Sequence, residues 1–195
     1  MTRRKFMVCG VAFGVALVTL LPAHAGAQAG GAWTTLFNGT NLDAFTPVGM
    51  ADWKIVDGAV EATMGAGHLV TKESYGDFEF RAEFWVSPDA NSGVFIRCEN
   101  PQVISGMTSY EVNIFDTRPD QTYRTGAIVN IAKPMSVVMT GNRWNTIVIT
   151  ARGPRMTVSI NDIPMVDVQD SAHARGRIAL QSGPGTVKFR NVQVR

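Results

Sequence analysis

Short runs in which every second residue is apolar recur along the chain and are broken by turn-forming residues. The clearest run spans residues 77–87, where one set of alternate positions, from Phe78 to Val86, is apolar and the other is mostly polar. Side chains that alternate in this way line the two faces of a β-strand. No stretch of useful length shows the 3.6-residue period of a helix. The pattern therefore restricts the chain to an all-β fold.

The apolar runs are short, closely spaced and separated by Gly, Asn, Asp and Pro. Strands are predicted at residues 53–56, 59–63, 68–71, 77–87, 94–98, 110–116, 126–131, 144–151, 156–160, 164–168, 178–181 and 187–194. Asp57-Gly58 and Asn161-Asp162 are hairpin signals between neighbouring runs. About a dozen strands at this spacing are typical of an antiparallel β-sandwich or jelly roll of two sheets.

The first 25 residues differ from the rest of the chain and are predicted to be a signal peptide. Thr2-Arg3-Arg4-Lys5 is basic, residues 6–21 form an uncharged apolar run, and Ala23-His24-Ala25 has the small-x-small pattern of a processing site. A processing site directly after a short apolar run favours an export signal over a membrane span. The two arginines resemble a twin-arginine signal, and an ordinary secretory signal that carries two arginines is the alternative.

Cleavage of the predicted signal would leave a short linker and one domain. Residues 26–32 are rich in alanine and glycine and are predicted to be a linker. The roughly 170 residues left after cleavage suit a single domain, which we expect at residues 33–195. The protein is expected to be periplasmic or secreted, with no membrane contact once the signal is removed.

The charge of the chain gives no reason to expect a nucleic-acid partner. The sequence has 18 basic and 16 acidic side chains, and residues 1–25 hold three of the basic ones and no acidic one. The predicted mature chain therefore has 15 basic and 16 acidic residues, a net charge of −1. A nearly neutral domain without a basic stripe lacks the electrostatic footprint of a nucleic-acid-binding protein.

Cys98 is the one cysteine of two that remains after the predicted cleavage, so an internal disulfide is excluded. It has the same parity as Val94 and Ile96 in the run 94–98. This parity predicts a small buried side chain and not a nucleophile.

A row of polar positions is predicted on the outer face of one sheet. Glu111 and Asn113 lie on the side of their strand opposite the apolar positions, because successive side chains alternate between faces. By the same parity the outer face would hold Phe95, Arg97, Glu111, Asn113 and Gln181, and Trp85 is a candidate for stacking on a sugar ring. Planar polar groups suit sugar hydroxyls, because each donates or accepts hydrogen bonds in a fixed geometry. The alternative for each residue is a solvated position on an exposed sheet.

Nine segments, in the same order, resemble the 3-keto-disaccharide hydrolase domain family, formerly a domain of unknown function. The segments are LFNGTNL (residues 36–42), WKIVDG (53–58), YGDFEF (75–80), NSGVFIR (91–97), YEVNIFD (110–116), TGAI (125–128), WN (144–145), GRIALQ (176–181) and FRNV (189–192). The similarity runs from about Trp33 to Arg195. It implies a concanavalin A-like jelly roll, in agreement with the strand pattern.

The resemblance also implies hydrolysis of 3-keto-glycosides. A keto group at C3 of a sugar acidifies the C2–H, a base removes that proton, the C1 substituent leaves and water adds. Glu111 is the first candidate for the base and Asp116 the second, and Arg97 is the candidate for stabilising the enediolate oxygen. The candidates for binding the carbohydrate substrate are Asn113, Gln181, Trp85 and Phe95.

No cofactor is expected. A divalent metal can stabilise the same negative charge, but the histidines left after cleavage, His68 and His173, occupy no ligand pattern.

Three positions depart from the family pattern and keep a second function open. The family usually has Gln where this chain has Asn113, often has Tyr where it has Val129, and often has His where it has Ser182. Val129 has the parity of the outer face, so a polar contact is lost there. The alternative to an enzyme is therefore a non-catalytic carbohydrate-binding module with a degraded active centre.

Overall fold

Alternating apolar residues give each strand one face that packs against a second sheet. The computed structural model describes Met1 and residues 31–195. The predicted signal peptide, apart from Met1, and the predicted linker up to residue 30 lie outside the described residues.

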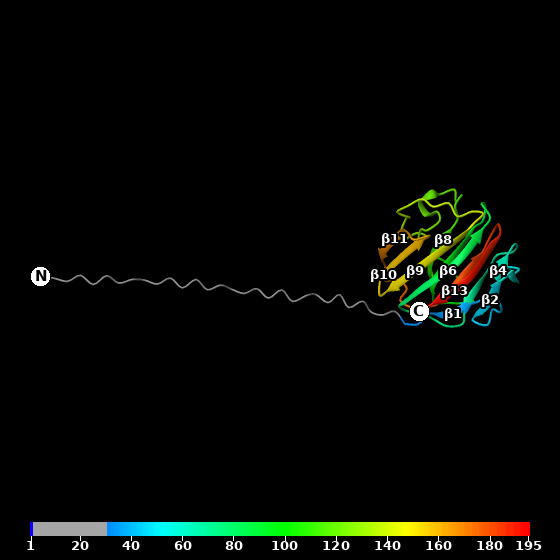
Figure 1. The fold of residues 1–195 in the computed structure, drawn as a ribbon, viewed down its shortest axis with the longest axis horizontal. Coiled ribbons are helices and arrows are strands. Elements are labelled where there is room, and N and C mark those ends of the chain that lie inside the picture. The colour runs from blue at the N-terminus through cyan, green and yellow to red at the C-terminus, as the bar shows by residue number, and fades with distance from the viewer. Residues whose placement is uncertain (2–30) are drawn as a thin grey trace. The chain divides into compact units, whose positions relative to one another are not determined.

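In the described part of the chain, one antiparallel sheet has eight strands (Figure 1). Its order is β11-β10-β9-β6-β13-β4-β3, and β1 also pairs with β13. The strands are β1 (Thr34–Phe37), β3 (Lys54–Val56), β4 (Ala59–Ala62), β6 (Phe78–Val86), β9 (Trp144–Arg152), β10 (Arg155–Ile160), β11 (Ile163–Gln169) and β13 (Val187–Val194).

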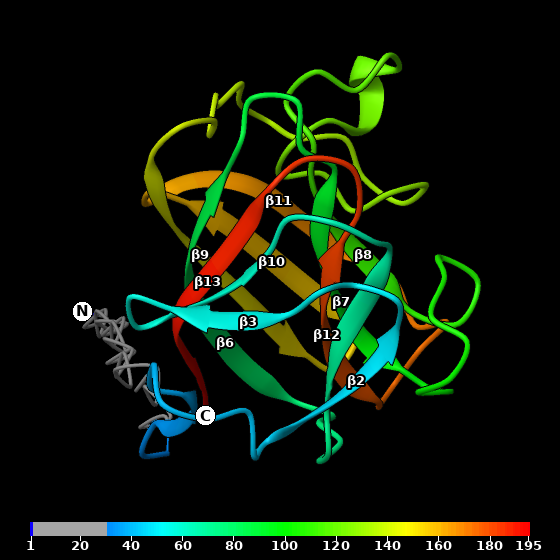
Figure 2. The same ribbon diagram turned by 90° about the vertical axis from the view of Figure 1, so that its right-hand side faces the viewer.

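The second described sheet has five strands in the order β2-β5-β12-β7-β8. They are β2 (Phe45–Gly49), β5 (Gly67–Thr71), β7 (Ser92–Cys98), β8 (Tyr110–Ile114) and β12 (Arg177–Ser182). Figure 2 separates the two layers, with β6, β9 and β13 in one and β2, β7, β8 and β12 in the other. The prediction of an all-β antiparallel sandwich of two sheets is confirmed.

At three places the predicted strands differ from those in the structure. Strands β1 and β2 were not predicted, because both are short and β2 contains Pro47, which argues against a strand from sequence alone. Residues 126–131 do not form a strand, since Ile128 makes only isolated bridges to Val112 and Ala132. The segment turns at Asn130, whose φ is +63°.

Among the described residues the helical segment is the short 3₁₀ turn η1 (Gln121–Tyr123), and no helix is long and apolar enough to cross a membrane.

The core lies between the two sheets. From the eight-stranded sheet, Phe80 and Phe84 of β6 are fully buried. From the five-stranded sheet, Leu69, Val94 and Leu180 of β5, β7 and β12 belong to the same cluster. Fully burying one side chain of this size contributes about 1.5–3 kcal/mol. The apolar face of the five-stranded sheet thus faces inward, which leaves the polar positions of these strands on its outer face.

A β-bulge at Arg97 exchanges the faces of the last residues of β7. Arg97 has a φ of +54°, and the pairing with β12 shifts register beside it. As a result Cys98 clusters with Phe95 on the outer face, while Ile96 stays in the core. The prediction that Cys98 shares a face with Ile96 is therefore wrong. Cys98 is nevertheless buried, and burial raises the pKa of its thiol to about 12.

We expect Gly176→Ala to destabilise the protein, because the bulge leaves no room beside it. A Cβ at Gly176 would lie 2.3 Å from the backbone carbon of Arg97 and 2.4 Å from the carbonyl oxygen of Cys98. The free energy of unfolding, measured by urea denaturation, should fall by about 1–3 kcal/mol. Gly106→Ala is the control, since its Cβ would meet only Asn130 Nδ2 at 4.0 Å. Equal stability of the two variants would contradict the close packing described here.

Candidate functional site on the five-stranded sheet

The outer face of the five-stranded sheet carries one row of residues from four neighbouring strands. The pairing register places His68 of β5 opposite Gln181 of β12. Gln181 lies opposite Gly93 of β7, and Gly93 lies opposite Asn113 of β8. We call these four residues the polar row. The row brings together side chains that are far apart in the sequence.

Three side-chain atoms of the polar row are buried without a hydrogen-bond partner in the described structure. They are His68 Nε2, Asn113 Oδ1 and Gln181 Oε1. An unpaired buried polar atom costs about 1–3 kcal/mol, so such atoms are rare unless a ligand or water satisfies them. Two further atoms of this kind belong to Trp53 and Arg124, outside the row. Three of the five such atoms in the described residues thus lie on one row.

Glu111 lies on the same face, beside the polar row. It is opposite Phe95, and the Phe95 ring packs edge-on against His68 with 5.3 Å between the ring centroids. Gly93 is buried, and little room remains beside its Cα. A Cβ at Gly93 would lie 3.1 Å from the carbonyl oxygen of Val112, 3.3 Å from Gln181 Oε1 and 3.5 Å from Glu111 Cγ. The absence of a side chain at this position thus lets Gln181 and Glu111 pack close to each other across β7.

Burial shifts the pKa values of two titratable groups on this face. It raises the pKa of Glu111 above its ordinary value, and the positive charge of Arg118 acts in the opposite direction. Burial also lowers the pKa of His68, so its imidazole is neutral at pH 7 and offers one donor and one acceptor. The two residues lie on β8 and β5, which are separated in the sheet by β7 and β12.

The loop after β8 fixes the amide of Asn113. Asn113 Nδ2 donates to the carbonyl of Tyr123 at 2.5 Å, and the Asn113 backbone pairs with Ala127 and Gly126 at 3.0 and 2.8 Å. With Nδ2 engaged by the loop, Oδ1 is left without a partner in a side chain that is fully buried. Val129 follows in the same segment and donates its N–H to the carbonyl of Glu111 at 3.0 Å. It is half-buried beside β8, where the family resemblance implies a tyrosine.

The structure places four of the predicted site residues on one face: Phe95, Glu111, Asn113 and Gln181. Their roles stay predictions.

The predicted position of Arg97 on this face is wrong. The bulge turns its side chain to the end of the sandwich, where it is 1% exposed. Its guanidinium donates to the carbonyls of Gly76 (3.1 and 3.2 Å), His173 (3.1 Å) and Gly153 (2.8 Å). The Asp77 carboxylate lies 3.6 Å away. Arg97 therefore links separate loops through hydrogen bonds to their carbonyl groups.

Asp116 is not available as a base either. Its Oδ1 accepts hydrogen bonds from the hydroxyls of Thr125 and Thr140, at 2.6 and 3.0 Å. Its Oδ2 accepts from the backbone N–H groups of Thr140 and Gly141, at 2.6 and 3.1 Å. The carboxylate is 6% exposed, and its four contacts join the two ends of the long loop between β8 and β9.

Trp85 lies on the other sheet. It belongs to β6, where it is opposite Trp144 of β9, so the prediction that it stacks on a sugar held by Glu111 is wrong. Parity alone assigned Trp85 to an outer face without saying which sheet the face belongs to.

Ser182, one of the three positions that depart from the family pattern, lies at the end of β12, where its hydroxyl donates to the carbonyl of Gly65 at 3.1 Å.

Three residues of the site were missed from the sequence. His68 has the parity of an outer position, but only the pairing of β5 with β12 brings it to Gln181. Gly93 has no side chain, and its effect on the spacing of Gln181 and Glu111 is visible only in the folded structure. Arg118 lies in a loop, where strand parity gives no direction. Among the described residues no group of three or more His, Cys, Asp or Glu side chains is arranged to hold a metal ion.

The model of the 3-keto-alpha-glucoside-1,2-lyase-like domain family matches residues 32–195 of the chain. The resemblance drawn from the sequence motifs is thereby confirmed. No curated protein matches the chain.

Solved structures share the fold. A candidate glycosyl hydrolase from Parabacteroides distasonis is 22% identical, with a TM-score of 0.72 over 85% of this chain and 99% of that one. The carbohydrate binding module CBM66 from Bacillus subtilis is 18% identical, with a TM-score of 0.62 over 76% and 93%. The β-glucanase from Bacillus licheniformis is 12% identical, with a TM-score of 0.57 over 86% and 98%. At these identities the likeness establishes the fold and not the activity.

We expect Glu111 to make the stability of the protein fall as the pH rises. Because its pKa is raised in the folded state, its contribution is fully present below the unfolded pKa near 4.5 and is lost as the pH rises through the folded pKa. Glu111→Gln stays neutral, so this variant should gain stability relative to the parent chain as the pH rises above the unfolded pKa near 4.5. Urea denaturation at several pH values measures the difference.

Glu83→Gln is the matched control and should change in the opposite direction. Burial works against ionisation of Glu83, but hydrogen bonds from Asn191 and Arg190 and the charge of Arg190 outweigh it and lower its pKa. Glu83 therefore stabilises the fold above its unfolded pKa, and Glu83→Gln should lose stability relative to the parent as the pH rises. The same direction for both variants would contradict the burial of Glu111.

Proposed function

Because the chain belongs to the family of 3-keto-alpha-glucoside-1,2-lyase-like domains, we propose that it is an exported enzyme that cleaves the glycosidic bond of 3-keto-glucosides. The active site is the polar row together with Glu111. The observation that carries the proposal is the group of three unpaired buried atoms beside a carboxylate with a raised pKa. The signal predicted in residues 1–25 directs the protein to the periplasm or the medium.

The reaction begins with removal of the C2 proton by the Glu111 carboxylate. The electron pair of the C2–H bond moves to the C3 keto oxygen and gives an enediolate. The C3 carbonyl then re-forms, a double bond forms between C1 and C2, and the bond from C1 to the glycosidic oxygen breaks. The leaving oxygen takes the proton held by Glu111. Addition of water across C1 and C2 releases the 3-keto sugar and completes a net hydrolysis.

The environment of Glu111 suits this first step. A base works best when its pKa lies near the working pH, and burial moves the pKa of Glu111 in that direction. Arg118, which replaces Arg97 in this role, lies close enough to Glu111 to act on its charge. In this proposal the guanidinium stabilises the negative charge that develops on the sugar oxygen.

The polar row orients the sugar. Gln181 Oε1 accepts a hydrogen bond from a sugar hydroxyl, and His68 Nε2 pairs with a hydroxyl or with the keto oxygen according to its tautomer. Both side chains are half-buried, whereas Asn113 is fully buried and holds the loop beside them through its bond to Tyr123. Gly93 lets Gln181 and Glu111 approach each other closely, so that both contact the same sugar. Satisfying unpaired atoms on binding recovers free energy that the empty face costs.

The alternative is a carbohydrate-binding module without catalysis. Val129 favours it, since an apolar side chain stands next to β8 where the family resemblance implies a tyrosine. The likeness of the fold to a carbohydrate binding module is compatible with it. Such a module would bind a glycan at the polar row and leave it unchanged.

Incubation of the purified protein with 3-keto-α-glucosides, such as 3-keto-trehalose, tests the proposal. The C1 substituent should be released, and Glu111→Gln should lower kcat/KM by about 100-fold or more, because the base is lost. Glu79→Gln on the eight-stranded sheet should leave kcat/KM unchanged, since Glu79 pairs with Arg195 away from this face. Product release is followed by chromatography.

Two results would overturn the enzymatic proposal. One is binding of the keto-sugar without product, with binding weakened by Glu111→Gln, which identifies a binding module. The other is turnover that Glu111→Gln leaves intact, which places the active site elsewhere.

A further inference from the structure

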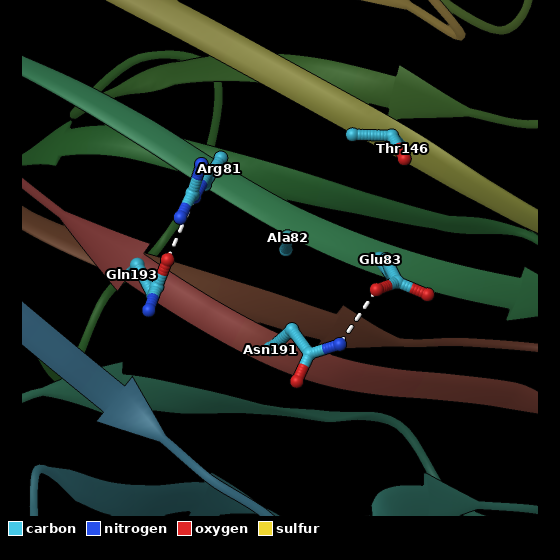
Figure 3. Close-up of a pocket in the computed structure, with 6 residues that line it drawn as sticks. All are labelled: Arg81, Ala82, Glu83, Thr146, Asn191 and Gln193. Carbon is cyan, nitrogen blue, oxygen red and sulfur yellow. Dashed lines mark hydrogen bonds between the residues drawn. The ribbon is translucent and has the colours of Figure 1, made fainter. Parts of the chain in front are cut away.

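Two hollows lie next to each other on the outer face of the eight-stranded sheet, which is not the sheet that carries Glu111. The first has a volume of about 290 Å³ and is lined by Arg81, Ala82, Glu83, Thr146, Asn191 and Gln193 (Figure 3). The second has a volume of about 390 Å³, and Trp85, Trp144, Lys188 and Arg190 are among its lining residues. Volumes of about 300–1,000 Å³ are usual for ligand sites.

A β-bulge in β13 shapes the first hollow. The pairing of β13 with β6 shifts register between Arg190 and Gln193, and Asn191 has a φ of +51°. The bulge adds Asn191 to the outer face, while Val192 remains in the core. Figure 3 shows Asn191 directed toward Glu83, with Ala82 on the floor between them and Arg81. The hollow therefore results from a defined backbone feature.

The Arg190–Glu83 pair joins the two hollows into one track. Glu83 Oε2 accepts from Arg190 Nε and Nη2 at 2.8 and 2.6 Å, and Glu83 Oε1 accepts from Asn191 Nδ2 at 2.6 Å. Arg81 continues the line, with its Nε donating to Gln193 Oε1 at 2.7 Å. The side chains of the track are thus held in place by one another before any ligand arrives.

Indole rings stand at both ends of the track. Trp85 and Trp144 are directly opposite each other at one end, with Lys188 5.4 Å from the centre of the Trp85 ring and Arg190 4.0 Å from that of Trp144. At the other end Arg81 and Arg195 lie 4.2 and 4.4 Å from the centre of the Trp33 ring, so Trp85 and Trp144, each with one cation at its ring, offer more free indole surface. Trp85 and Arg81 are four residues apart on β6, which spans roughly 14 Å at the rise of a β-strand.

We propose that this track is a second ligand site, which binds a neutral glycan chain along β6. Indoles supply apolar faces for the C–H surface of sugar rings, and the amides, guanidinium groups and carboxylate between them supply partners for hydroxyls. The glycan is neutral because two of the three cations that line the track are already paired with carboxylates: Lys188 with Glu61 at 2.5 Å and Arg190 with Glu83 at 2.6 Å. The third, Arg81, donates to the Gln193 amide and lies over the Trp33 ring. An anionic polymer would have to displace these carboxylates.

The second site does not depend on the function proposed for Glu111. The track lies on the other sheet and contains no residue of the polar row. The track binds a glycan without catalysis, whether the polar row is an active site or a binding site. Its consequence is that one domain has two separate glycan-binding faces.

Isothermal titration of the full protein with cellohexaose, laminarihexaose, maltohexaose and an oligogalacturonate of equal length tests the proposal. One of the neutral hexasaccharides should bind. Trp85→Ala should raise its Kd at least about 10-fold. Asn191→Gly should raise it about 3- to 10-fold, because glycine accepts the positive φ of the bulge while the amide is lost.

Two control variants separate the track from other effects. Asn142→Gly removes an exposed Asn with a φ of +61° outside the track and should leave Kd unchanged. Glu111→Gln should also leave Kd unchanged, because Glu111 lies on the other sheet. The proposal is overturned by no binding at millimolar concentration, by an unchanged Kd in both track variants, by stronger and salt-sensitive binding of oligogalacturonate, or by loss of binding in Glu111→Gln alone.

Discussion

Two buried charges hold the ends of the β7–β8 pair, and the candidate site depends on them. At one end the guanidinium of Arg97 donates to the carbonyls of Gly76, Gly153 and His173, which belong to three separate loops. At the other end the carboxylate of Asp116 accepts from Thr125 and Thr140. Each charge is desolvated, so the compensating hydrogen bonds must be complete, and this fixes the loops around the face.

Between these ends the five-stranded sheet presents polar atoms that the fold itself does not satisfy. Arg97 and Asp116 use their hydrogen-bonding capacity within the protein, whereas His68, Asn113 and Gln181 each leave one buried atom unpaired. The contrast separates residues that stabilise the fold from residues whose unpaired atoms the fold does not satisfy. The raised pKa of Glu111 arises from the same burial.

The outer faces of the two sheets differ in chemistry. The polar row holds three buried polar atoms without a partner, and Gly93 brings Gln181 close to Glu111. The eight-stranded sheet offers a longer track in which Lys188 and Arg190 are already paired with carboxylates and indoles stand at the ends. A β-bulge shapes each sheet locally, at Arg97 in β7 and at Asn191 in β13, because an extra residue redirects the side chains around it.

The alternation of apolar residues was enough to determine the all-β sandwich and the outward direction of Glu111, Asn113 and Gln181, since parity is a local property of a strand. It failed for Arg97 and Cys98, because one residue with positive φ reverses the parity after it. It could not assign Trp85 to a sheet or bring His68 to Gln181, because parity says nothing about which strands pair. Only the tertiary structure decided these neighbours, since strand pairing depends on the packing of the whole core and not on any one strand.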